Sequence, residues 1–384
     1  MSEPQAPLAG VRVLDFTTAM AGPTASMLLA DFGADVIKVE PPEGESSRRW
    51  GTARFGAAAD TSGLFLALNR NKASITLDLK SAEGAAAVDR LVREADVVME
   101  SFKPGVADRL GIGYEQLRAA KPDLVYVSVS GFGQNGPLRE APGYDQLLQA
   151  FSGHMSITGE PGRPSVRIGP SAIDLITGAH AAFGVVLALR VRDRTGAGQR
   201  VETSLYDSSL HLISHYIADY TGSGRLPEKI GGSFAFLAPY GMYQARDREL
   251  YLGVGTDAMF AKLCGALGAP QLVGDPRFVA NPQRIAHREE LDEALAPLFA
   301  AGDAAHWVEV CLALGIPASL VNDLSEVLAQ EQAVAREMII DSGVDGVRTA
   351  GLPLKLELTP ARIRRPPPSL GADNAALLSD RPDA

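Results

Sequence analysis

Hydrophobic residues in the first 200 positions fall into short apolar runs separated by stretches with helical spacing. The runs predict strands at 11–14, 36–39, 97–99 and 124–129, and the alternation of Ile75, Leu77 and Leu79 predicts another. Between them, Gly22-Pro23 opens a helix that ends near Gly33, and apolar residues recur at helical spacing over 85–95. Apolar strands alternating with helices are typical of a parallel sheet covered on both faces, so a doubly wound α/β domain is expected.

The pattern changes along the rest of the chain. An Ala- and Gly-rich helix is predicted over 174–189 and another over about 204–220. After Thr221 the sequence indicates a hairpin at 242–244 and 250–252, helices at 257–267, 287–299 and 303–314, and a strand at 316–321. Asp257 and Asp303 are candidate helix N-caps. Residues 225–325 therefore form a smaller α+β domain, and the proline-containing tail is expected to wrap over a surface.

Composition narrows the class of protein. The 384 residues carry 36 basic and 46 acidic side chains, a net charge of −10, which argues against a nucleic-acid-binding surface. Cys264 and Cys311 form no disulfide or metal-ligand spacing, which favours a reducing, cytoplasmic location. The first ten residues lack a signal-peptide pattern, and the longest apolar stretch, 181–189, is too short to span a bilayer, so no membrane association is expected.

One glycine motif is misleading. Residues 131–136 read Gly-Phe-Gly-Gln-Asn-Gly after a strand, in the form of a dinucleotide fingerprint. A fingerprint needs a helix to begin inside the motif, but Pro137 follows at once. The segment is predicted to be a loop, and a nicotinamide or flavin oxidoreductase is disfavoured.

The first strand-to-helix turn holds Thr17, Thr18, Ala19 and Met20 at a carboxyl edge of the sheet, before a helix N-terminus. Free N–H groups there suit an anionic or amide-rich ligand. Read by itself, however, the segment is more simply explained as a turn between a strand and a helix.

Asp174 is the candidate nucleophile. As a structural residue it would be an N-cap or a first-turn carboxylate. As a catalyst it would form a covalent acyl intermediate, with N–H groups at the helix start stabilising the oxyanion. Asp145, preceded by Tyr144, is either the N-cap of its own helix or part of the same pocket. The pair His211 and His215 has metal-ligand spacing but no obvious acidic third ligand, so no metal is expected.

A set of blocks in order resembles the family III CoA-transferases over nearly the whole chain, more weakly after about residue 230. The blocks are 7–16, 21–23, 29–40, 68–72, 102–105, 130–133, 143–145, Asp174 with Thr177-Gly178, and 195–199. The resemblance implies a Rossmann-like domain over 1–200 completed by 345–384, a linker helix at 201–224, the small domain at 225–325 and a linker at 326–344. It also implies an interlocked homodimer.

The resemblance further implies that Asp174 attacks an acyl-CoA and passes CoA to a carboxylic acid through a mixed anhydride and an aspartyl-CoA thioester. CoA or acyl-CoA is then a substrate, and no permanent cofactor is needed. Tyr144 and Asp145 complete the catalytic set. The residues implied to contact CoA are Thr18, Ala19, Met20, Leu68, Asn69, Arg70, Ser101, Phe102 and, at a phosphate, Arg109.

The sequence departs from the family pattern at several positions. Pro41 stands where a basic residue is common, so Arg70, Lys72, Arg48 or Arg49 are candidates to hold the phosphates, and Ser101 replaces an asparagine. Tyr144 stands where the related acyl-CoA racemases have histidine, and a tyrosine is a poor general base at neutral pH. This favours a transferase over a racemase or isomerase, while a non-catalytic acyl-CoA-binding protein stays an alternative. Arg163 or Arg167 is a candidate to hold the second carboxylate of a dicarboxylic acceptor.

Overall fold

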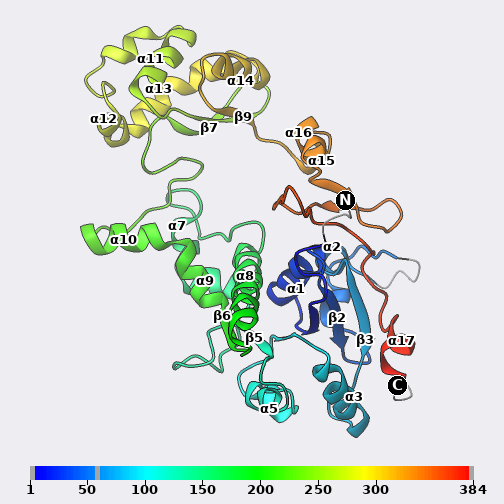
Figure 1. Ribbon diagram of the computed structural model, residues 1–384. Coiled ribbons are helices and arrows are strands. Elements are labelled where there is room, and N and C mark those ends of the chain that lie inside the picture. Colours follow the sequence, from blue (N-terminus) through cyan, green and yellow to red (C-terminus); the bar gives the residue numbers. More distant parts are fainter. Residues whose placement is uncertain (1–4, 57–60, 380–384) are drawn as a thin grey trace. The chain divides into compact units, whose positions relative to one another are not determined.

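The computed structural model describes residues 5–56 and 61–379, which divide into two compact units (Figure 1). The larger unit comprises 1–154, 167–224 and 331–384, and the smaller comprises 155–166 and 225–330. Compared with the expected boundaries, the larger unit also takes 201–224 and 331–344, whereas 155–166 goes to the smaller unit.

The larger unit is built on a six-stranded sheet in the order β3-β2-β1-β4-β5-β6, with every neighbouring pair parallel. The strands are β1 (Arg12–Phe16), β2 (Asp35–Glu40), β3 (Lys72–Thr76), β4 (Val97–Glu100), β5 (Val125–Ser130) and β6 (Arg200–Ser204). Five correspond to predicted strands. β6 was not predicted because it is an edge strand whose residues Arg-Val-Glu-Thr-Ser form no apolar run.

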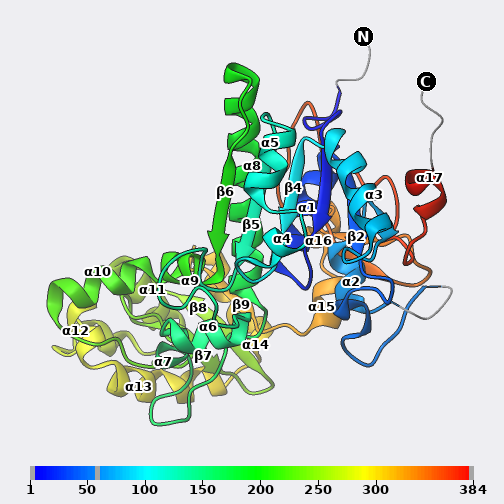
Figure 2. The ribbon, with the colours of Figure 1, turned by 90° about the horizontal axis from the view of Figure 1, so that it is seen from below.

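Helices cover both faces of this sheet (Figure 1, Figure 2). On one face α1 (Ala21–Asp31) and α8 (Ala172–Thr195) pack against alternate strand residues such as Val13 and Val127. On the other face α3 (Ala82–Arg93) and α5 (Tyr114–Ala120) pack against the intervening residues, including Leu14. The other helices of this unit before residue 225 are η1 (Ser46–Arg49), α2 (Gly63–Leu68), α4 (Val106–Arg109), α6 (Asp145–Phe151), α9 (Leu205–Leu212) and α10 (Ser214–Ser223). Helix α7 (His154–Ile157) lies where the chain passes from the larger to the smaller unit.

Helix α8 is longer than predicted and unevenly buried. By length and composition it could cross a membrane, a test that core helices also pass, and 44% of its apolar window is buried. Its buried side lies against α1, where a Cβ on Gly178 would come within 2.6 Å of the Ala21 carbonyl oxygen. Its other side leaves Phe183 63% and Leu187 50% exposed. The high hydropathy of α8 thus has two sources: residues that pack in the core and apolar residues on its exposed side.

The smaller unit contains an antiparallel sheet in the order β7-β8-β9, formed by Tyr240–Gln244, Glu249–Gly253 and Ala318–Leu320. Around it lie α11 (Asp257–Ala266), η2 (Pro270–Gly274), α12 (Asn281–Ala286), α13 (Arg288–Ala300), α14 (Ala304–Ala313) and α15 (Leu324–Leu328).

Of the two predicted helix caps in this unit, Asp257 is wrong, whereas Asp303 lies at its predicted position but makes no capping bond. The side chain that accepts an N–H at the start of α11 is that of Thr256, and Asp257 is the first helical residue. Asp303 occupies the N-cap position of α14, but its carboxylate bonds to Arg246, and the Ala304 N–H donates to Asp247 instead.

The C-terminal segment returns to the larger unit. It contains α16 (Glu331–Ala335), the hairpin β10 (Ile339–Asp341) and β11 (Arg348–Ala350), and α17 (Asn374–Leu378). Next to α17 it runs along the free edge of β3: the Ser74 N–H donates to Asp373 Oδ2 (2.8 Å) and the Thr76 N–H to Asn374 Oδ1 (2.9 Å). The tail thus closes one side of the sheet.

Candidate active site

A cavity of about 510 Å³ opens at the carboxyl ends of β1, β4 and β5. The strand order reverses between β1 and β4, which is where open α/β sheets bind ligands. Eight of the predicted site residues line this one cavity: Thr18, Ala19, Met20, Ser101, Phe102, Tyr144, Asp145 and Asp174. Trp50, Lys103 and Arg139 also line it, although no role for them was predicted.

Asp145 closes the N-terminus of α8. Its Oδ2 accepts the N–H groups of Ile173 (2.8 Å) and Asp174 (3.0 Å), whereas Ser171 at the N-cap position makes no side-chain bond of this kind. Asp145 is the first residue of α6 rather than its N-cap, so that interpretation is wrong. These two N–H groups are also occupied, which removes them as the expected oxyanion donors.

Asp174 is the third residue of α8 and carries an unusual carboxyl group. Burial raises its pKa, and the neighbouring negative charge of Asp145 raises it further, to about 7. Across residues 5–56 and 61–379 no side chain or N–H group donates a hydrogen bond to its carboxylate. The group is therefore a half-buried carboxyl that faces a cavity and receives no hydrogen bond from the described residues. That arrangement suits a nucleophile.

Tyr144 reaches the cavity because two loops cross closely. A Cβ on Gly131 would lie 2.8 Å from the Gly143 Cα atom, so only glycines allow this approach. The crossing brings Tyr144, which is 60% exposed, and Asp145 to the cavity. The motif at 131–136 thus lies in an irregular loop with no helix, as predicted.

The turn at 17–20, between β1 and α1, was expected to offer free N–H groups to a ligand. Its N–H groups are not all free: that of Thr18 donates to Ser101 Oγ (3.0 Å) and that of Ala19 to Glu45 Oε2 (3.2 Å). Ala19 has φ of 67°, a left-handed conformation that is uncommon for a residue other than glycine. The turn therefore forms a wall of the cavity in which the N–H groups of Thr18 and Ala19 already have partners.

Four residues implied to contact CoA lie outside this cavity: Leu68, Asn69, Arg70 and Arg109. Arg70 is 3% exposed and bonds through Nε and Nη2 to the Asp31 carboxylate, so its guanidinium does not face this cavity. The buried Asn69 amide donates to the Phe65 carbonyl and accepts from Lys72, and Leu68 packs in the core. Lys72 and Arg48 are likewise engaged with buried acids, as described below.

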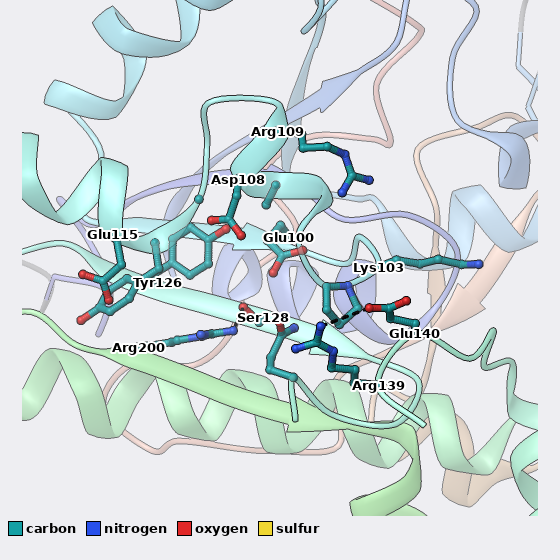
Figure 3. A pocket seen from close by; sticks show the side chains of 16 residues that line it. Glu100, Lys103, Asp108, Arg109, Glu115, Tyr126, Ser128, Arg139, Glu140 and Arg200 are labelled. Carbon is teal, nitrogen blue, oxygen red and sulfur yellow. Dashed lines mark hydrogen bonds and ion pairs between the residues drawn. The ribbon is translucent and has the colours of Figure 1, made fainter. Parts of the chain in front are cut away.

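Arg109 lines a second cavity of about 450 Å³ that adjoins the first and shares Lys103, Pro104 and Arg139 with it (Figure 3). Figure 3 shows Arg139 paired with its neighbour Glu140, at 3.1 Å. The shared wall therefore offers two cations, Lys103 and Arg139, beside Arg109. The position of Lys103 directly after Phe102 could have indicated from the sequence that it lies at the site. Nothing in the sequence around Arg139 indicated this.

The other candidate cations and metal ligands have other roles. The Arg167 guanidinium turns back to its own loop and bonds to the carbonyls of Ile168 and Gly169. Arg163 lies in the smaller unit, where its carbonyl accepts from Lys229. The His211 ring packs against that of His180, and the described part of the chain holds no group of three metal-ligating side chains.

Comparison with known proteins gives a consistent result. The chain matches the model of CoA-transferase family III over residues 8–374. It is 39% identical over 382 residues to an acetyl-CoA:oxalate CoA-transferase of Acetobacter aceti, covering 99% of this chain and 97% of the relative. It is 38% identical over 385 residues to a succinate–glutarate CoA-transferase of Agrobacterium fabrum, covering 97% and 95%. Among solved structures, a CAIB/BAIF family protein from Brucella suis aligns with a TM-score of 0.90 at 36% identity, covering 97% of this chain and 99% of that one. The chain belongs to CoA-transferase family III and is a CoA-transferase.

Proposed function

We propose that this enzyme transfers CoA from an acyl-CoA to a dicarboxylic acid through covalent intermediates on Asp174. The observation that carries the proposal is the state of the Asp174 carboxyl group. It lines the cavity, no described side chain or N–H group donates to its carboxylate, and its pKa is raised to about 7 by burial and by Asp145.

The reaction consists of acyl transfers in which charge is conserved. A carboxylate oxygen of Asp174 attacks the thioester carbonyl, the C–S bond breaks, and CoA leaves as the thiolate, which gives a mixed anhydride. The thiolate attacks the aspartyl carbonyl carbon, the C–O bond breaks, and the donor acid leaves as a carboxylate. The acceptor carboxylate then attacks the aspartyl-CoA thioester and releases the thiolate. That thiolate attacks the acceptor's acyl carbon, which yields the new thioester and frees Asp174.

The electrostatics of the site favour the first step. In the resting enzyme the charged form of Asp174 is penalised by burial and by Asp145. Acylation makes the group neutral, so both penalties disappear as the anhydride forms. A carboxylate with a raised pKa is also a stronger nucleophile than an exposed one. Because Asp145 already occupies the N–H groups at the start of α8, we assign the Tyr144 hydroxyl, also at the cavity, as a hydrogen-bond donor to the oxyanion.

Two observations support a dicarboxylic acceptor. The relatives named above are called transferases of oxalate or glutarate, and another, from Chloroflexus aurantiacus, is named for D-citramalate; each of these acids has two carboxylates. The shared wall of the two cavities provides Arg139, whose present partner is an exposed neighbour and therefore holds it weakly. We assign Arg139 to the remote carboxylate of the acid, and Lys103 and Arg109 to CoA phosphates. Replacement of Arg139 by Gln would then raise KM for the acid without changing KM for acyl-CoA.

We also propose that the enzyme is a homodimer in the cytoplasm. The dimer, expected to be interlocked, would cover the exposed apolar side of α8, where Phe183 and Leu187 are at least half exposed. Free thiols at Cys264 and Cys311 suit a reducing compartment. Light scattering on the wild type and on Leu187→Glu tests the dimer: the variant should be monomeric.

The experiment for the main proposal is intact-mass analysis after brief exposure to a panel of acyl-CoAs, beside Asp174→Asn. The expected result is an adduct of acyl or CoA mass that hydroxylamine removes and that the variant lacks. Saturable CoA binding without any adduct would refute the aspartyl mechanism. Uptake of deuterium at the α-carbon of the thioester would instead indicate the racemase reaction.

A further inference from the structure

A cluster of six buried charged side chains lies beside the turn at 17–20. It comprises three acids and three bases, each at most 2% exposed: Asp15, Glu40, Glu45, Lys38, Arg48 and Lys72. They form three ion pairs, Lys38–Glu45 at 3.5 Å, Arg48–Glu40 at 2.7 Å and Lys72–Asp15 at 3.2 Å. Burying six charges costs desolvation that such pairs rarely recover, so net stability is a poor explanation for the cluster.

What the cluster contacts is the backbone of the turn. Asp15 Oδ1 accepts the N–H of Thr17 at 2.9 Å, and Lys38 Nζ donates to the Thr17 carbonyl oxygen at 3.0 Å. Glu45 Oε2 accepts the Ala19 N–H at 3.2 Å. Buried charged side chains therefore hydrogen-bond to the backbone of the turn, while Thr18, Ala19 and Met20 of the same turn line the cavity.

Ala19 is the residue that needs to be held. Its φ of 67° is the left-handed conformation, which a side chain with a Cβ disfavours. Strained residues of this kind persist only where the surroundings determine them. The Glu45 carboxylate is the group bonded to the Ala19 N–H, and it is itself fixed by Lys38 and by the hydroxyl of Ser47.

We propose that Glu45 is a positioning residue for CoA binding: by holding the Ala19 N–H, it keeps the turn at 17–20 in the left-handed conformation that forms the CoA-binding wall. Glu45 does not line the cavity, so it acts through Ala19. The proposal rests on the assignment of this cavity to CoA, but not on the aspartyl mechanism or on the identity of the acceptor.

The test measures binding of free CoA by isothermal titration calorimetry. Glu45→Gln keeps the size of the side chain and removes the charge that faces Lys38 and Ala19, and the Kd should rise about tenfold. The matched control is Asp31→Asn, which breaks another buried ion pair, with Arg70, at the far end of α1, and should change the Kd less than twofold. Adding Ala19→Gly to Glu45→Gln should recover at least threefold of the lost affinity, because glycine adopts the left-handed conformation without help. A role in folding stability alone would not produce that recovery.

The outcomes separate the proposal from its premise. An unchanged Kd in folded Glu45→Gln, or an equal loss in Asp31→Asn, overturns the positioning role. Thr18→Trp, at an exposed residue of the cavity wall, should weaken binding strongly; if it does not, CoA binds elsewhere and the cavity assignment fails as well. Should Glu45→Gln not fold, Ser47→Ala loosens Glu45 more gently and should raise the Kd about threefold, and a change below 1.5-fold would count against the proposal.

Discussion

Replacing Asp174 by Asn is expected to stabilise the protein at high pH and to leave its stability unchanged at low pH. The pKa of this carboxyl group is raised from 3.8 to about 7 in the folded protein. Below pH 3.8 the group is neutral in both the folded and the unfolded state. As the pH rises from about 4 to 7 the unfolded chain releases the proton more readily, so the wild type loses stability across this window. Asn cannot ionise and does not incur this loss.

The magnitude follows from the size of the pKa shift. Three pKa units correspond to about 4 kcal/mol at pH 8 and above. Asp174 is partly exposed, and solvent screening reduces this figure, so we expect about 2 kcal/mol. The larger unit has about 270 residues, for which the entropy of unfolding is about 0.6 kcal/mol/K. The Tm of Asp174→Asn should therefore exceed that of the wild type by about 3–4 °C at pH 8.5.

Thermal unfolding followed by fluorescence at pH 4.0 and pH 8.5 measures this difference directly. Asp89→Asn is the control, because Asp89 is exposed in a surface ion pair and its replacement should shift the Tm by less than 1 °C at either pH. A gain in Tm that is the same at both pH values would show that Asn improves packing rather than removing a charge. A wild type more stable than Asp174→Asn at pH 8.5 would refute the reasoning.

Three further changes test other parts of the structure. Asp145→Asn removes a negative charge but keeps an acceptor for the start of α8, so the pKa of Asp174 should fall and the acidic limb of the kcat/KM profile should move to lower pH. Gly178→Ala places a Cβ 2.6 Å from a carbonyl oxygen of α1, and urea denaturation should show a loss of about 1–3 kcal/mol; an unchanged midpoint would mean that the helices separate freely. Arg284→Met leaves the carbonyls of Ala238 and Phe278 without their buried donor, which should cost about 3 kcal/mol of the unfolding free energy. A loss below 1 kcal/mol would show that water replaces the guanidinium.

Local patterns predicted the elements that bury apolar residues. Strands β1 to β5 and the main helices of the larger unit follow from apolar runs and helical spacing, because both faces of this sheet are covered. The edge strand β6 was missed because its pairing with β5, not its own composition, makes it a strand. The same limit applies to α10 (Ser214–Ser223), which has no fully buried residue and is separated from α9 at Ile213.

The candidate site likewise has a part that the sequence predicted and a part that it did not. Residues carried by ordered motifs, such as Asp174 and Phe102, lie at one cavity because β4 ends there and α8 begins there. Ion pairs and hydrogen bonds between residues far apart along the chain could not be predicted from the sequence pattern. Arg70 pairs with Asp31, 39 residues earlier, and the start of α8 is closed by Asp145, 29 residues before Asp174. Sequence alone does not show which acid a given arginine or helix terminus meets, because many acids are available to each.

The tail that runs along β3 has a consequence for synthesis. An unpaired edge strand offers a row of free N–H and carbonyl groups to any other extended chain. Here the groups that cover that edge, Asp373 and Asn374, come after the smaller unit along the chain. The ribosome therefore completes the whole smaller unit, residues 225–330, before the partner of this edge emerges. A nascent chain carries the sheet with its edge uncovered throughout that interval, and a chain that stops just short of residue 373 never covers it.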